Sequence, residues 1–346
     1  MIFILILSAT ITITCAGKKL TDSDDEDPIE NPDPFEQNKR IGRGINLGNA
    51  LEAPNEGDWG VVLRQEYFKL IKDAGFQSVR IPIRWSNHAQ ADSPYTISPT
   101  FFNRVDWAII QARNNNLAAI INIHHYEEIM EHPEAHKKRY LSLWRQIANR
   151  YKDEPLDLFF EILNEPNNQL IPALWNQYLL EGLKLIRESN TQRTVIIGTA
   201  NWGGIGSLAE LQVPDEDPYL IVTFHYYNPF QFTHQGAEWV SGSEAWLGTT
   251  WTGTTAQKQA VVNDLNQASA WASQQNRPMF MGEFGAYSKA AMDSRVRWTE
   301  FVRSEAEKRG FSWAYWEFCS GFGVYDPNQN SWRTELLQAL IPPVSP

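Results

Sequence analysis

The sequence predicts an α/β protein that consists of a single (β/α)8 barrel, or TIM barrel. From residue 40 onward, short apolar segments alternate with amphipathic stretches, which is the pattern of a parallel sheet with crossover helices. The chain has 346 residues, which leaves room for a complete barrel of about 250 residues with insertions. Polar and aromatic residues follow the apolar segments at one end, where barrel enzymes carry their catalytic groups.

Eight segments are expected to form the strands, because each is short, mostly apolar and bounded by turn residues. They span residues 41–49, 78–85, 118–125, 156–164, 194–202, 220–227, 278–284 and 311–319.

Helices are indicated between the strands by apolar residues spaced three and four apart. Gly75 and Gly310 follow two of these stretches, as glycines at helix ends commonly do. The helices are expected over residues 59–74, 99–115, 134–151, 172–188, 255–275, 292–308 and 332–340, with a short or irregular element at 208–213.

The fourth strand ends in Asn164, Glu165 and Pro166. Proline has no N–H to donate to a neighbouring strand, so this strand should stop there. Glu283 closes the seventh strand and follows Gly282, which lets backbone and ligand come close. Two carboxylates at two strand ends of one barrel can cleave a glycosidic bond.

Arg80 lies inside the otherwise apolar second strand, and a buried charge is costly unless it is paired. We therefore expect it beside Glu283. Glu161 shares the parity of Glu165 but lies deeper, and it is expected to pair with a barrel arginine such as Arg43 or Arg80. Glu317 has the opposite parity to the residue before it and is expected to face the helices.

Histidines and aromatic residues end three further strands. Adjacent side chains on a strand point to opposite faces, so only one of His124 and His125 should enter the barrel. His225 and Tyr227 share a face and can both point inward, although His225 could also be a hydrogen-bonded core histidine. Trp316 ends the eighth strand. Because no third ligand stands at metal spacing, we expect no metal site.

The long segment 228–254 after the sixth strand is rich in aromatic residues, in a chain with 14 Trp, 12 Tyr and 17 Phe. These side chains could pin the loop to the barrel, but a long segment without a clear helix is more often functional. Sugar rings present apolar faces that stack on such side chains. The aromatic residues of the segment are Phe230, Phe232, Trp239, Trp246 and Trp251.

The N-terminal part differs in composition from the rest. Residues 1–16 resemble an export signal, and their apolar run is too short to span a bilayer, so no integral membrane domain is expected. Cys15 could carry a lipid. Residues 17–38 are acidic and predict a disordered tether before a catalytic domain at 39–342. Cys319 is expected to be a small core residue. These features indicate an extracellular or cell-surface protein.

In this order along the chain, the strand-end residues resemble those of glycoside hydrolase family 5, a family of retaining (β/α)8 enzymes. The similarity covers about residues 40–341. The segments 44–54, 228–237 and 313–318 are similar to bacterial endo-β-1,4-glucanases (cellulases) with cross-activity on mannans. The matching residues are Arg80, His124, Asn164, Glu165, His225, Tyr227, Glu283 and Trp316.

The resemblance implies that Glu165 is the acid/base and Glu283 the nucleophile. Tyr227 would donate to Glu283, and His124 to the substrate or the nucleophile. Asn164 would hold the sugar 2-hydroxyl and Trp316 the sugar face. Asn49, Glu52, His125 and Trp239 are expected to bind sugars farther along the cleft.

The expected partner is a β-linked polysaccharide or oligosaccharide such as β-glucan or glucomannan, bound by a monomer without any cofactor. A net charge of -11 argues against nucleic acid. A β-1,4-mannanase, glucomannanase or xyloglucanase with the same mechanism is the first alternative. A barrel that binds carbohydrate without catalysis and a metal-dependent barrel hydrolase or isomerase are the others.

Overall fold

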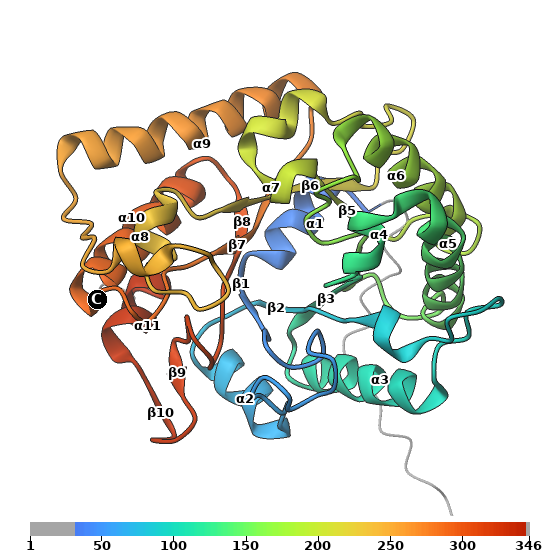
Figure 1. Cartoon of the computed structure of the whole chain (residues 1–346), viewed down its shortest axis with the longest axis horizontal. Coiled ribbons are helices and arrows are strands. Elements are labelled where there is room, and N and C mark those ends of the chain that lie inside the picture. The colour runs from blue at the N-terminus through green and yellow to red at the C-terminus, as the bar shows by residue number, and fades with distance from the viewer. Residues whose placement is uncertain (1–31, 344–346) are drawn as a thin grey trace, which may run out of the picture. The chain divides into compact units, whose positions relative to one another are not determined.

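The computed structural model describes residues 32–343, and in them eight parallel strands close into a barrel (Figure 1). Each strand pairs with the next along the chain, and the last pairs with the first. The predicted fold is thereby confirmed. The strands are β1 (Arg43–Asn46), β2 (Ser78–Ile81), β3 (Ala118–Asn122), β4 (Leu158–Glu161), β5 (Val195–Gly198), β6 (Leu220–Tyr226), β7 (Met279–Phe284) and β8 (Ser312–Tyr315).

Most strands end earlier than predicted. β2 was expected to reach residue 85 and ends at Ile81, and β3 was expected to reach residue 125 and ends at Asn122. Beyond the ladder the backbone is no longer held in extended pairing, so side chains need not alternate between two faces. The polar residues expected at the strand ends therefore lie mostly on the loops that follow.

The larger helices surround the barrel (Figure 1). α9 and α10 have the predicted bounds. α2 begins six residues later than predicted, because Gly57 and Gly60 adopt φ values of 98° and 83° and keep that stretch in a loop. The helices are α2 (Gln65–Asp73), α3 (Pro99–Asn114), α5 (Pro133–Arg150), α6 (Pro172–Arg187), α9 (Thr255–Gln275), α10 (Met292–Lys308) and α11 (Thr334–Leu340).

The loops contain short helices and two short strands. The segment 228–254 contains two of them, so it is more ordered than the sequence suggested. They are η1 (Trp85–His88), α4 (Glu127–Glu131), α7 (Ala200–Gly203), η2 (Ile205–Glu210), α8 (Phe230–Thr233), η3 (Ser243–Trp246), β9 (Tyr325–Asp326) and β10 (Ser331–Trp332).

Helix α1 (Pro34–Ile41) was not predicted. The Asp33 side chain accepts a hydrogen bond from Phe35 N at 2.8 Å and caps its first turn. Its last residue, Ile41, is buried among inward-facing strand residues, and α1 lies across the middle of the ring in Figure 1. Residues 34–38, expected in the tether, are helical because this helix covers the barrel end. Residues 17–31 of the tether and the predicted signal with Cys15 lie outside the described residues.

The core has two parts. A large apolar cluster fills the space between the barrel and its helices, and a smaller one fills the amino end of the barrel interior. The interior nearer the carboxyl ends of the strands is polar instead, with Asn46, Arg80, Asn122 and Glu161 at most 1% exposed. Within residues 32–343, no helix is both long and apolar enough to cross a bilayer.

Candidate active site

Arg80 is the centre of the polar interior. Its fully buried guanidinium donates to both oxygens of Glu161, at 2.6 and 2.7 Å, and to Glu283 Oε1 at 2.7 Å. It also donates to Asn46 Oδ1 and Asn164 Oδ1, each at 2.8 Å. One cation thus orients two carboxylates and two amides, and its own burial is compensated by these bonds. Both expected partnerships of Arg80 are confirmed.

Arg43, the other partner considered for Glu161, pairs with Glu307 at 2.8 Å. Glu283 is held a second time by Tyr227, whose hydroxyl donates to Glu283 Oε2 at 2.9 Å. Burial and the negative charge of Glu283 raise the pKa of Tyr227 well above its ordinary value. The phenol therefore keeps its proton, and it can only donate to Glu283.

Glu165 lies just beyond β4 with a φ of 45°, and its side chain is 26% exposed, which leaves it accessible to a ligand. His225 Nδ1 lies 2.6 Å from Glu165 Oε1 and 3.6 Å from Glu283 Oε2. Burial disfavours a charged imidazole, but the two carboxylates outweigh it and raise the pKa of His225. His225 therefore bridges two acids and is more than a core histidine.

The spacing of the two carboxylates indicates their chemistry. Ligand atoms of Glu165, His225 and Glu283 all lie within 4.8 Å of one another. This is close to the ~5–5.5 Å of retaining glycosidases and shorter than the ~6.5–9.5 Å of inverting ones. The same three side chains could also hold a metal ion by distance. The positive charge of Arg80 beside Glu283 disfavours a second cation there, and the absence of a metal stays a prediction.

Both histidines after β3 lie near the catalytic groups, but only His124 is buried, at 2% exposed, whereas the His125 side chain is 36% exposed. Their rings are 4.6 Å apart, because β3 has already ended and His125 has a φ of 49°. Asn122 Nδ2 lies 3.1 Å from His124 Nδ1, and its Oδ1 accepts from Ile83 N. This amide orientation makes Nδ1 the acceptor, so the proton of His124 sits on Nε2. Burial, followed by His125, lowers the pKa of His124 well below its ordinary value.

Trp316 follows β8 and stacks against His124, with ring centres 5.9 Å apart and planes at 9°. Its indole passes close to Gly48, where a Cβ atom would lie 3.1 Å from two indole carbons. The next residue, Glu317, was expected to face the helices. It is fully buried, its carboxylate accepts N–H groups of its own loop, and it interacts electrostatically with Arg295 of α10. Cys319 is buried, as expected.

Two residues expected to bind sugars lie on the loop after β1. Asn49 is half-buried with a φ of 64°. Glu52 is fully buried, and its carboxylate accepts the N–H groups of Asn49 and Ala50. Direct contact between Glu52 and a sugar is therefore ruled out in this conformation. Sequence parity could not show this, because burial here depends on the covering loops.

The aromatic residues of 228–254 divide into two groups. Phe232 and Trp251 are buried and pin the segment, whereas Trp239 is 60% exposed. Trp239 packs edge-on against Tyr287, with ring centres 4.9 Å apart. Tyr287 belongs to a small cluster on which Trp316 also packs. Trp239 is thus an exposed aromatic surface next to the catalytic groups.

Some residues of the site were missed from the sequence. Asn46 and Asn122 orient Arg80 and His124, and their inward position at strand ends was the available signal. Trp202 is 57% exposed, and its backbone N–H donates to Pro166 O at 3.3 Å, next to the Glu165 loop. Trp59 contacts His125 edge-on at 5.3 Å. The sequence alone could not show that the loops carrying Trp202 and Trp59 lie beside the site.

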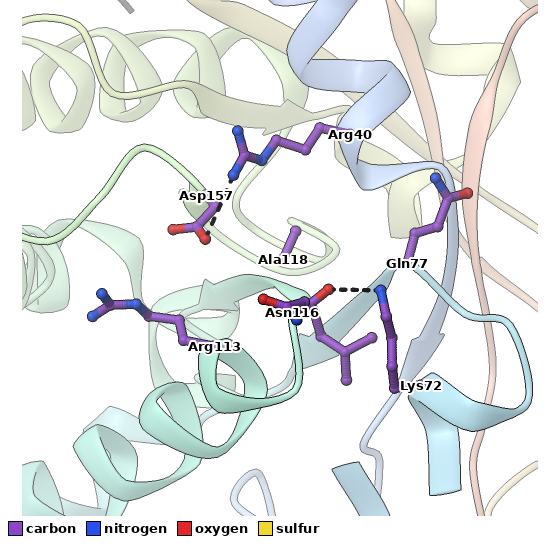
Figure 2. A pocket seen from close by; sticks show the side chains of 8 residues that line it. Arg40, Lys72, Gln77, Arg113, Asn116, Ala118 and Asp157 are labelled. Carbon is purple, nitrogen blue, oxygen red and sulfur yellow. Dashed lines mark hydrogen bonds and ion pairs between the residues drawn. The ribbon is translucent and has the colours of Figure 1, made fainter. Parts of the chain in front are cut away.

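A separate cavity of about 270 Å³ lies at the opposite end of the strands (Figure 2). Figure 2 shows Lys72 bonded to Asn116 O, at 2.9 Å, and Arg40 facing Asp157, at 3.7 Å. Arg113 pairs with a glutamate outside the cavity lining. These cations bind a backbone carbonyl just beyond α3 and two carboxylates, and we assign them a structural role.

Comparison with protein families and known proteins places these residues in context. Residues 42–321 match the family model described as Cellulase (glycosyl hydrolase family 5). Endoglucanase H of Acetivibrio thermocellus is 37% identical over 317 residues, which are 90% of this chain but 34% of that protein. Endoglucanase B of Clostridium cellulovorans is 30% identical over 332 residues, 88% of this chain and 74% of that one. The chain thus spans about a third of Endoglucanase H.

Solved structures are similar as well. Thermotoga maritima Cel5A in complex with cellobiose is 59% identical, with a TM-score of 0.88, and the match covers 89% of this chain and 100% of that one. The same protein in complex with mannotriose is 58% identical, with a TM-score of 0.88 and the same coverage.

Proposed function

The chain belongs to the cellulase family, glycosyl hydrolase family 5, and from this premise we propose that it is a retaining endo-β-1,4-glucanase that cleaves internal bonds of β-glucans. The observation that carries the proposal is the carboxylate pair Glu165 and Glu283, whose oxygens lie within 4.8 Å. The similarity to endoglucanases over most of the chain supports it.

In the proposed mechanism, Glu283 attacks the anomeric carbon while Glu165 protonates the leaving oxygen. Arg80 and Tyr227 occupy both oxygens of Glu283, so its position is fixed before substrate binds. A water activated by Glu165 then releases the glycosyl-enzyme, with net retention. Because Asn164 Oδ1 accepts from Arg80, its NH2 group is the one that can bind the sugar 2-hydroxyl.

Glucomannan is the proposed second substrate, with the glucan preferred. Cel5A of Thermotoga maritima has been crystallised with both cellobiose and mannotriose, and the exposed Trp239 offers a face that senses the sugar ring more than one hydroxyl. Asn49, His124, His125 and Trp316 are proposed to contact the sugars.

Activity on barley β-glucan, carboxymethylcellulose, glucomannan, galactomannan and xyloglucan tests the proposal. We expect a fast drop in viscosity and a ladder of oligosaccharides from β-glucan and, more slowly, from glucomannan. Release of glucose alone from chain ends would contradict the endo mode. Binding without hydrolysis would favour the inactive carbohydrate-binding barrel, and activity lost to a chelator would favour a metal enzyme.

The stereochemistry has its own test. NMR of the first product formed from a β-linked oligosaccharide should show the β-anomer, and an initial α-anomer would contradict the double displacement.

We also propose that the protein is exported to the cell surface or the medium, with residues 1–16 as signal, residues up to about 33 as tether and the barrel as a monomeric catalytic domain. The composition of these segments supports this. Cell fractionation of the full chain and of Cys15→Ser, with light scattering of the soluble protein, would check export, lipid attachment and oligomeric state.

A further inference from the structure

Two buried carboxyl groups lie close to the catalytic residues without being part of the proposed mechanism. Glu52 follows β1 and Glu317 follows β8, and both are 0% exposed. β1 and β8 pair directly where the barrel closes, so the two loops emerge side by side. Burying a carboxyl group is costly, and such groups persist where their hydrogen bonds serve a purpose.

Each carboxyl group organises its own loop. Glu52 accepts the N–H of Ala50 at 3.0 Å and the N–H of Asn49. Asn49 has a φ of 64°, a left-handed conformation that asparagine adopts more readily than most residues, and the Glu52 carboxylate holds its N–H in place. Glu317 accepts the N–H groups of Cys319, Ser320 and Phe322 at 2.8 to 3.1 Å. These hydrogen bonds from backbone to carboxylate therefore stabilise the conformation of both loops, which strand pairing does not hold at these positions.

The two loops also contact each other. A Cβ on Gly48 would lie 3.1 Å from the Trp316 indole and 3.2 Å from Glu317 Cβ, so the first loop packs against the second at that point. Phe318 N donates to Asn46 O at 3.0 Å and ties the second loop to the first strand. A shift of either loop would therefore move Trp316.

We propose that Glu52 and Glu317 are positioning residues that hold Asn49 and Trp316 at the sugar-binding surface. This inference rests on the proposed function, since it takes Trp316 and Asn49 as sugar contacts. Neither glutamate touches the sugar, and each acts through the loop that it supports. Trp316 and Asn49 would keep their places only while both carboxyl groups stay packed.

The charges around the pair make this support sensitive to pH. Glu317 interacts electrostatically with Glu52, with Arg295 of α10, and with Cys319 and Tyr315. Burial raises the pKa of Glu52 to about 8 and that of Glu317 to about 7. As pH rises past both values, a second negative charge forms beside the first, and the two loops should separate.

The test uses the full-length protein with Glu52→Gln, Glu52→Ala and Glu317→Gln, and with Glu66→Gln on the exposed face of α2 as the matched control. With β-glucan at pH 6, Glu52→Ala should raise KM about tenfold, the effect of losing one or two hydrogen bonds, with little change in kcat. Glu52→Gln should raise it less, because it keeps one acceptor oxygen. Glu66→Gln should match the wild type.

The pH profile separates positioning from mere stability. The wild-type KM should rise as pH passes about 8, as Glu52 titrates, whereas the KM of Glu52→Gln should stay flat. Hydrogen exchange measured by mass spectrometry should show faster exchange at residues 46–53 and 313–322 in Glu52→Ala. An unchanged KM, or unchanged exchange in these two peptides, would overturn the proposal.

Failure of the proposed function gives a different result. A wild type without activity on any of the glucans would refute the glucanase, and the exchange experiment would still decide whether the two glutamates hold the loops. If Glu52→Ala does not fold, the dependence of KM on pH and the hydrogen exchange of Glu52→Gln test the proposal in the same way.

Discussion

At the residue scale, the two acids of the site differ in their surroundings. Glu283 is 5% exposed, and hydrogen bonds from Arg80 and Tyr227 hold both of its carboxyl oxygens in place. Glu165 faces outward and contacts only His225 through its carboxyl group among the bonds described above. This asymmetry fits a fixed nucleophile and an acid/base that must exchange its proton with leaving group and water.

Substitutions of the two acids should therefore have separable effects. Glu283→Ala should lose activity, and added azide or formate should restore part of it with an inverted product, since the anion enters from the vacated face. Glu165→Ala should spare an aryl cellobioside with a good leaving group far more than β-glucan, because such a group needs little proton donation. Equal slowing of both substrates, measured by initial rates, would disprove the acid role of Glu165.

His225 should contribute stability that depends on pH. Its pKa is raised in the folded protein despite burial, by Glu283 and Glu165, so the folded state holds this proton more tightly than the unfolded state. The contribution is complete below the ordinary histidine pKa of about 6.5 and is lost as pH rises through the raised value. Urea unfolding at pH 5.5, 6.5 and 8 should show a difference between wild type and His225→Gln that shrinks with pH. A difference that grows with pH would contradict this assignment.

At the scale of the elements, an irregularity between β6 and β7 aligns the catalytic groups. The register shifts between Phe224 and His225, so that His225 pairs with Glu283. Without this shift, the regular ladder would pair His225 with Gly282. The backbone of Gly282 runs so close to β6 that a Cβ there would lie 2.6 Å from Thr223 Oγ1 and 3.2 Å from His225 Nε2.

Gly282→Ala should consequently displace His225 and slow catalysis. Overpacking of this kind costs roughly 1–3 kcal/mol, and we expect kcat on β-glucan to fall about tenfold or more with a smaller change in KM. Gly206→Ala is the matched control, because a Cβ at Gly206 meets no atom within 4 Å. Normal kinetics of Gly282→Ala would show that the β6–β7 spacing does not control the site.

Helix α1 should stabilise the barrel from its amino end. Ile41 is fully buried among inward-facing residues such as Phe159 and Ile120, and Ile41→Ala should lower the free energy of unfolding by roughly 2–5 kcal/mol. Phe35→Ala, at a position that is 41% exposed, should change it by about 0.5 kcal/mol or less. Urea unfolding measures both. Activity of folded Ile41→Ala should be normal, since the site lies at the other end of the strands.

At the scale of the whole molecule, barrel closure brings residues from β1 to β8 to one rim. Trp239 stands at this rim on a segment anchored by buried Trp251 and Phe232. Trp239→Ala should raise KM for both β-glucan and glucomannan with kcat nearly unchanged, because stacking serves ground and transition states alike. Ile110→Ala, an exposed residue on α3, is the control. A large loss of kcat would place Trp239 in the chemistry instead.

The sequence by itself determined the alternation of strands and helices, the positions of Glu165 just after the fourth strand and of Glu283 at the end of the seventh, and the need of Arg80 for a buried partner. These features depend on local periodicity, on proline and glycine, and on the cost of an unpaired charge, all of which act over a few residues.

The tertiary structure alone decided which strand-end residues share the site. His124 and His125 lie together, and Glu52 turns inward, because side-chain alternation ceases where the ladder ends and loops from other strands decide what is covered. Helix α1 covers the amino end of the barrel only because that end is apolar and can bury Ile41. Burial and loop contacts of this kind are properties of the closed ring, which no single stretch of the chain contains.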